Sequence, residues 1–334
     1  MKKIKRINII FLIIILSISL IACKTEEKTE TPDKTQEQNK QDTAKHPAIP
    51  EAISQGEGVE PKLVVHIAEE GRNQEMAFEE YLQGVLAGEM KNDWPEEALK
   101  AQAILARTFV MEFVSSGKES KYEGAHISTD IEEAQAWNSE GINDAIKKAV
   151  NDTRGQVVLH NNEYIKAWFH AHAGGQTANA VEGLGFDEEN PAYIEPVSSP
   201  DSEEAPEDDS NWTAEFTKAE IIQAVKSSGQ EISDFDSIEI SEKGDSGRAY
   251  KLKIGDVEVL APPFRIALDS TKLKSTQITD ITIEGDIVKI SGVGYGHGVG
   301  MSQWGAYQMA EEGKTAEDII LHYFKDVEIV QLWQ

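Results

Sequence analysis

The chain has 334 residues and a formal net charge of −27 at pH 7, with 59 acidic residues against 32 basic ones. This balance argues against binding to nucleic acid, which depends on basic surfaces, and against holding an anionic polymer by charge alone. The single cysteine, Cys23, excludes an intrachain disulfide and any metal site built from several cysteines.

The N-terminus has the features of an export signal. Basic residues cluster in positions 1–6, and an apolar run follows to Ala22. The run has the length of a signal sequence and is short for a membrane span. It ends in Leu-Ile-Ala-Cys, which resembles a bacterial lipobox. We therefore expect residues 1–22 to be a signal peptide, Cys23 to carry a lipid, and the protein to be extracytoplasmic and anchored to the cell membrane. The alternative is an uncleaved anchor with an incidental cysteine.

Residues 23–57 are rich in Lys, Glu, Thr, Gln and Pro and contain no aromatic residue. Such a segment buries too little apolar surface to offset its chain entropy, so it is predicted to be a disordered linker. Residues 58–334 are long enough for one large domain or two coupled ones.

The first half of this region combines predicted strands and helices. The helix predicted over 96–114 carries apolar residues on nearly every face and should be buried. Asn161-Asn162 is a turn signal between two strands. The predicted elements are a strand at 61–68, helices at 77–90, 96–114 and 141–150, and a hairpin of strands 155–159 and 164–170.

The second half reads mainly as short strands. An acidic run at 195–209 is predicted to be a loop, and Thr217-x-x-Glu220 and Thr315-x-x-Asp318 are capping boxes that begin helices. Strands are expected at 237–240, 249–254, 257–260, 278–283 and 287–290. Because strands and helices do not alternate regularly, we predict a mixed α+β fold with a β-rich inserted subdomain at about 195–290.

Glu89 is the strongest catalytic candidate among the acids. It lies at the end of an apolar helix, beside Gly88 and before a Trp-Pro turn. Apolar surroundings raise the pKa of a carboxyl group, which suits a general acid near neutral pH. The alternative is a solvated glutamate at a helix end. Lys100 and Arg107 share a face of the next helix and either line a cleft or reach solvent and pair with acids.

Two further segments are candidates for ligand contact. His170 and His172 are two residues apart before a glycine pair, which is a weak metal signal because no third ligand is apparent nearby. His297 lies in a loop with glycine at alternating positions, and the loop leads to Ser302, a predicted helix N-cap. Trp304 is either a sugar-stacking residue or a core residue.

Together these segments resemble the stage II sporulation protein D family, which is also known from amidase-modifier proteins of the cell wall. The matching motifs, in order, are YLQGVLAGEM, WPEEALKAQAILARTF, FHAHAGGQT, GYGHGVGMSQWGA and ILHYF, and they span most of residues 77–324. The resemblance implies a lytic transglycosylase that cleaves MurNAc–GlcNAc bonds in glycan strands already stripped of peptide, forming 1,6-anhydro-MurNAc during sporulation or wall remodelling.

The resemblance also implies site residues and partners. The family's catalytic glutamate falls on Glu89, and the substrate-binding candidates are Gln102, Arg107, His170, His297, Ser302, Gln303 and Tyr323. Peptidoglycan strands and a cell-wall amidase are the expected partners. Some relatives carry a cysteine where Ala173 stands, and some bind zinc through a cysteine and a histidine. The only cysteine here is Cys23 of the lipobox, so we expect no zinc of that type, and no other metal or cofactor. The competing interpretation is a non-catalytic wall-binding protein that stimulates an N-acetylmuramoyl-L-alanine amidase.

Overall fold

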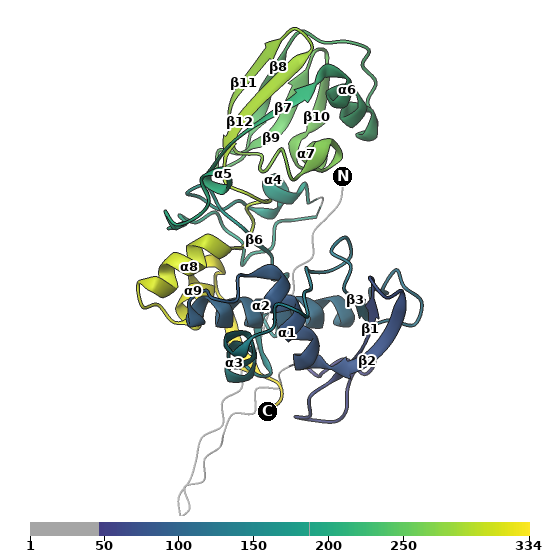
Figure 1. Ribbon diagram of the computed structural model, residues 1–334, viewed down its shortest axis with the longest axis vertical. Helices are drawn as coiled ribbons and strands as arrows, with labels where there is room; N and C mark the ends of the chain where they lie inside the picture. The colour runs from purple at the N-terminus through teal and green to yellow at the C-terminus, as the bar shows by residue number, and fades with distance from the viewer. Residues whose placement is uncertain (1–46, 187) are drawn as a thin grey trace, which may run out of the picture. The chain divides into compact units, whose positions relative to one another are not determined.

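The computed structural model describes residues 47–186 and 188–334 of the chain (Figure 1). The predicted signal peptide, Cys23 and most of the predicted linker lie outside these residues. The described chain is a mixed α+β structure, as the sequence predicts, with two hydrophobic cores. Within the described residues, no helix combines the length and apolar character that a membrane span requires.

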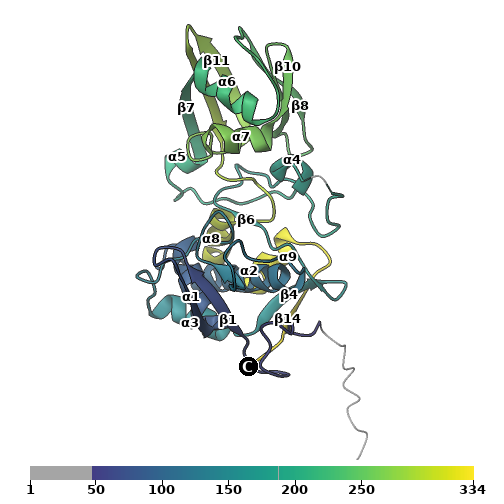
Figure 2. The same ribbon diagram turned by 90° about the vertical axis from the view of Figure 1, so that its right-hand side faces the viewer.

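The first core is built around α2 (Glu96–Ser115), which is buried along most of its length, as its apolar faces predict. Other helices and strand β4 (Gln156–His160) pack against it on several sides (Figures 1 and 2). The helices around it are α1 (Phe78–Glu89), α3 (Asp144–Asp152), α8 (Gln303–Glu311) and α9 (Ala316–Tyr323).

Small sheets complete this core. One has the order β2-β1-β3, another β14-β4-β5, and β6 pairs in parallel with β13. Their bounds are β1 (Lys62–Ile67), β2 (Arg72–Ala77), β3 (Ile127–Ser128), β4 (Gln156–His160), β5 (Glu163–Tyr164), β6 (Phe169–His170), β13 (Met301–Ser302) and β14 (Glu328–Gln331).

The predicted hairpin forms only in part. Asn161 and Asn162 have φ angles of 51° and 66°, the left-handed conformation that a tight two-residue hairpin turn requires. The second arm, predicted over 164–170, was too long. Only β5 pairs with β4, whereas β6 leaves the hairpin and pairs with β13, which follows it by more than 100 residues.

The second core holds two three-stranded antiparallel sheets, of orders β10-β9-β8 and β11-β12-β7. The predicted capping box of Thr217 and Glu220 begins α6. Helix α7 was not predicted; its second and third residues are prolines, which are well tolerated in a first helical turn. The elements are β7 (Asn211–Thr217), α6 (Lys218–Ser227), β8 (Ile238–Lys243), β9 (Ala249–Ile254), β10 (Val257–Leu260), α7 (Ala261–Asp269), β11 (Ile278–Glu284) and β12 (Ile287–Val293). Short helices α4 (Ala180–Leu184) and α5 (Glu207–Ser210) precede them.

Two features differ from the sequence-based prediction: where the packed chain begins, and how far the acidic run is buried. The packed chain begins before residue 58, because Ile53 is buried in the first core and its carbonyl accepts a hydrogen bond from the Lys62 amide. The acidic run at 195–209 is largely irregular, as predicted, but it is not wholly a solvated loop. Ser199 and Ser202 are buried within it and the Asp201 side chain is only 5% exposed, which its composition did not indicate.

Candidate active site

Glu89 is the last residue of α1, and the backbone becomes extended at Met90, with φ −130° and ψ 153°. The Met90 side chain is buried, whereas Glu89 is partly exposed. A hollow of about 520 Å³ opens beside the carboxyl group, and we call it the Glu89 groove. Its lining residues are Ala87, Gly88, Glu89, Met90, Lys91, Asn92, Asp93, Asn138 and Gly141.

Two glycines of α1 bring a distant loop to Glu89. A β-carbon on Gly88 would lie 2.6 Å from the backbone of Ala136 and Trp137, and one on Gly84 would lie 2.0 Å from the Trp137 indole. Glycines four residues apart share a helix face, so together they form a shallow channel for this loop. The Ala136 amide thereby donates to Glu89 Oε1 at 2.7 Å.

Burial raises the pKa of Glu89 from 4.5 to about 7. The Ala136 amide and the Gln303 side chain oppose this shift, because hydrogen-bond donors stabilise the ionised carboxylate. The carboxyl group is therefore near its midpoint at neutral pH, where a group that both gives and accepts a proton is most effective. The structure thus provides the environment that the sequence predicted for Glu89.

A residue of α8 also forms a hydrogen bond with Glu89. Gln303 Nε2 donates to the Glu89 backbone carbonyl at 3.1 Å. Ser302 is the N-cap of α8, as predicted, and its Oγ accepts from the Gly305 amide. Of the predicted substrate-binding residues, Gln303 therefore contacts Glu89. Among the described residues, Glu89 is the only predicted catalytic or substrate-binding residue that lines the groove.

Asp201 holds Ser302 in place, and nothing in the sequence beyond its acidic neighbours indicated this role. Its buried carboxylate accepts from Ser302 Oγ at 2.6 Å, from Ser199 Oγ at 2.9 Å and from the Gly175 amide at 3.0 Å. Tyr323 joins the same cluster through a 2.9 Å hydrogen bond between its hydroxyl and Ser199 Oγ. Ser302 and Tyr323 are both buried, so they contribute to this internal network.

His170, at the end of β6, and His297, in the glycine-rich loop, lie close together. The rings of His170 and His297 have centroids 5.7 Å apart. Burial lowers both pKa values, that of His297 to about 3, and the positive charge of Arg248 adds to the effect. Both rings are therefore neutral at pH 7. A β-carbon on Gly296 would lie 2.8 Å from His170 Cβ, which explains the need for glycine there.

Arg107 lies in the first core and pairs with an acid, the alternative that the sequence left open. Its guanidinium is fully buried and forms two hydrogen bonds with the Glu79 carboxylate, at 3.1 and 2.6 Å. Glu79 also accepts from the indole of Trp333 and the amide of Gly155. Gln102 is fully buried on the same helix, and its side-chain amide has no hydrogen-bond partner among the described residues.

An aromatic cluster adjoins the groove at the turn between α1 and α2. Trp94 and Trp304 have ring centroids 4.5 Å apart, and Tyr307 lies within 5.3 Å of both. Trp304 is buried, which agrees with the core interpretation, while Trp94 and Tyr307 are partly exposed. The Lys91 ammonium lies over the Trp304 ring, 5.5 Å from its centroid.

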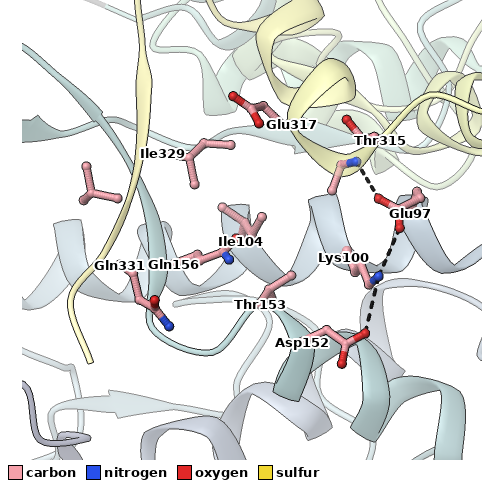
Figure 3. A pocket seen from close by; sticks show the side chains of 12 residues that line it. Glu97, Lys100, Ile104, Asp152, Thr153, Gln156, Thr315, Glu317, Ile329 and Gln331 are labelled. Carbon is pink, nitrogen blue, oxygen red and sulfur yellow. Dashed lines mark hydrogen bonds and ion pairs between the residues drawn. The ribbon is translucent and has the colours of Figure 1, made fainter. Parts of the chain in front are cut away.

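A second hollow, of about 400 Å³, lies between α2, α3, α9 and β14 and shares no lining residue with the Glu89 groove (Figure 3). Lys100 is held there by Glu97 and Asp152, at 3.0 and 3.4 Å. Glu97 also accepts from the Ala316 amide at 2.8 Å. Lys100 therefore pairs with acids, as its alternative interpretation predicted, and links three helices.

Comparison with known proteins places these features in a family. The model of the stage II sporulation protein family matches residues 68–160, which contain α1, α2 and Glu89. The chain is 29% identical to stage II sporulation protein D of Bacillus subtilis over 277 residues, covering 75% of this chain and 74% of that protein. The chain belongs to the stage II sporulation protein D family.

Other relatives extend this result. An uncharacterized protein of Brachyspira hyodysenteriae is 32% identical over 259 residues, covering 77% of this chain and 67% of that protein. The amidase enhancer of Bacillus subtilis is 28% identical over 289 residues, which cover 73% of this chain but only 39% of the enhancer. A domain of unknown function matches residues 197–300, a range that includes every buried residue of the second core.

Proposed function

We propose that this chain is a peptidoglycan lytic transglycosylase that cleaves MurNAc–GlcNAc bonds and forms 1,6-anhydro-MurNAc. The observation that carries the proposal is the Glu89 carboxyl group, which has a pKa of about 7 and borders an open groove. A group at its midpoint near pH 7 donates a proton and then accepts one without a large energetic penalty in either direction.

The reaction needs one carboxyl group. Protonated Glu89 donates its proton to the glycosidic oxygen as the C1–O bond of MurNAc breaks. The 6-hydroxyl oxygen of the same sugar bonds to C1 and gives its proton to the Glu89 carboxylate, which restores the acid. No water is consumed. The Ala136 amide, at 2.7 Å from Oε1, stabilises the carboxylate formed between the two steps.

Asp93 is the other acid that lines the groove, and it is exposed in the turn after α1. A hydrolase would use two carboxylates and water. The products separate the two mechanisms: transglycosylation leaves anhydro ends, whereas hydrolysis leaves reducing ends that are heavier by one water.

The setting follows from the relatives. Because the family includes a sporulation protein and an amidase enhancer, we place this chain in cell-wall remodelling during sporulation, together with a cell-wall amidase. The N-terminal sequence supports export and a lipid anchor at Cys23. On this proposal, wild type should incorporate a radiolabelled fatty acid and Cys23→Ala should not. Absence of the label from wild type would refute the lipid anchor.

The test of activity uses the purified protein and peptide-free glycan strands, with no amidase present. Wild type should release anhydro-MurNAc products, detected by mass spectrometry, and Glu89→Gln should release none. Glu80→Gln is the matched control, because Glu80 is an exposed glutamate of the same helix. Anhydro products from the Glu89→Gln protein would overturn the assignment.

A second function is supported by the likeness to the amidase enhancer. In that case the chain binds the wall without cutting it and stimulates an N-acetylmuramoyl-L-alanine amidase. Wild type would then leave glycan strands intact, and both wild type and Glu89→Gln would accelerate peptide release by the amidase.

A further inference from the structure

Lys91 is placed at the Glu89 groove by the same local geometry that ends α1. Met90 is extended and its side chain is buried, whereas Lys91 is exposed and Glu89 is partly exposed. Glu89 and Lys91 therefore both border the groove. In extended backbone the Cα atoms of such neighbours are about 7 Å apart, within the span of one sugar ring and its substituents.

Helix α8 contacts both residues through consecutive side chains, at the Glu89 backbone and at the Lys91 ammonium. Gln303 donates to the Glu89 carbonyl, and the ring of Trp304 lies beneath the Lys91 ammonium. Trp304 is itself fixed by Trp94 and Tyr307. A cation over an aromatic face is held without losing its hydrogen-bond donors, so Lys91 keeps them available for a ligand.

Although the chain is strongly acidic, a basic side chain borders the groove. Lys91 is the only basic side chain among the described residues that line the groove, and its ammonium forms no ion pair with a described residue. The other charged groups there are the carboxyls of Glu89 and Asp93. In a protein of net charge −27, an anionic ligand in this groove has Lys91 as its point of attraction.

We propose that Lys91 binds the lactyl carboxylate of N-acetylmuramic acid and so selects glycan from which the peptide has been removed. The inference rests on the proposed function and adds the residue that sets its specificity. The sugar carries the bond to be cut at C1 and the lactyl ether at C3. While the peptide is attached, the lactyl group is a neutral amide. An amidase converts it to a carboxylate, which forms a charge-assisted hydrogen bond with an ammonium.

The experiment measures binding without cleavage. The Glu89→Gln protein is titrated with peptide-free glycan strands and with the same strands after their carboxyl groups are converted to methylamides. We expect the free-carboxylate strands to bind about fivefold tighter, as for a partly exposed ion pair, and the preference to shrink at high salt. Adding Lys91→Gln should reduce the ratio of affinities to about one.

Two further variants control for charge and folding. Lys91→Arg keeps the cation and should retain the preference. Lys226→Gln removes an exposed lysine of α6 and should also retain it. A Lys91→Gln protein that still prefers the carboxylate strands, or a parent with no preference, would overturn the inference. Anhydro-product formation by wild type is scored separately, so a cleaving enzyme without the preference refutes only the role of Lys91.

Discussion

At Glu89, burial and hydrogen bonding act on one carboxyl group in opposite directions. Burial raises its pKa, while the Ala136 amide and Gln303 stabilise the charge, and the balance is a pKa of about 7. The catalytic cycle proposed here starts from the protonated form. Its availability in the free enzyme therefore depends on pH within the physiological range.

The first prediction concerns rate against pH. The protonated fraction of Glu89 is nearly complete below pH 6 and falls about tenfold for each pH unit above 7. We expect kcat/KM for glycan cleavage to follow that fraction, with a single limb near pH 7. Measurement of initial rates from pH 5 to 9 checks this. A limb near pH 4.5 would mean that burial does not perturb this carboxyl group.

The second prediction concerns stability. The folded pKa of Glu89 is raised above its unfolded value of 4.5, so the native state loses stability as the pH rises from 4.5 to 7. Glu89→Gln removes this ionisation. We expect the variant to be more stable than wild type by about 1–3 kcal/mol at pH 8 and equally stable at pH 4. Urea unfolding at both pH values measures the difference. Equal stability at pH 8 would contradict it.

At the scale of elements, α1 positions the acid because its glycine face admits the loop that carries Ala136. The third prediction is that Gly88→Ala destabilises the protein. Helix propensity alone favours alanine by about 1 kcal/mol. The added β-carbon, however, would lie 2.6 Å from the backbone of Ala136 and Trp137, so the loop must move. We expect a net loss of about 1–3 kcal/mol, as for overpacking.

The same movement should weaken the hydrogen bond from Ala136 to Glu89. Because that bond favours the ionised form, its loss should shift the limb of the pH–rate profile upward. Thermal unfolding and the pH profile together test both effects. A Gly88→Ala protein with a raised melting temperature and an unchanged profile would show that the loop does not depend on this glycine.

At the scale of the whole molecule, the buried pair of Arg107 and Glu79 joins distant parts of the first core. It links α1 to α2 and, through Glu79, to Gly155 and the C-terminal Trp333. The fourth prediction is that Arg107→Met costs about 3–5 kcal/mol, because it leaves the Glu79 carboxylate buried and uncompensated.

The double variant Arg107→Met, Glu79→Leu removes both charges and should recover much of that stability. Denaturant unfolding measures both proteins, and kcat/KM of the double variant tests the role that the sequence assigned to Arg107. A folded double variant that cleaves glycan normally would confine Arg107 to a structural role. Loss of kcat/KM at full stability would show that the buried pair also positions the site.

Local signals account for the features that the sequence predicted well. Helices α1 and α2, the caps at Thr217, Ser302 and Thr315, and the strands β8 to β12 of the second core follow from periodicity and capping within a few residues, whereas β7 was not predicted. The family motifs pointed to Glu89. The paired glycines of α1 were also visible, and their four-residue spacing is a signal of close approach that could have indicated a partner loop.

By itself, the sequence determined the α+β composition, the family and the acid at the end of α1, because each depends on residues close together in the chain. Only the tertiary structure decided that Ala136 reaches Glu89, that Asp201 secures α8, and that Arg107 pairs with Glu79. It also showed that Lys91 is the cation bordering the groove. These contacts join segments that are far apart in the sequence, so local sequence patterns do not predict them.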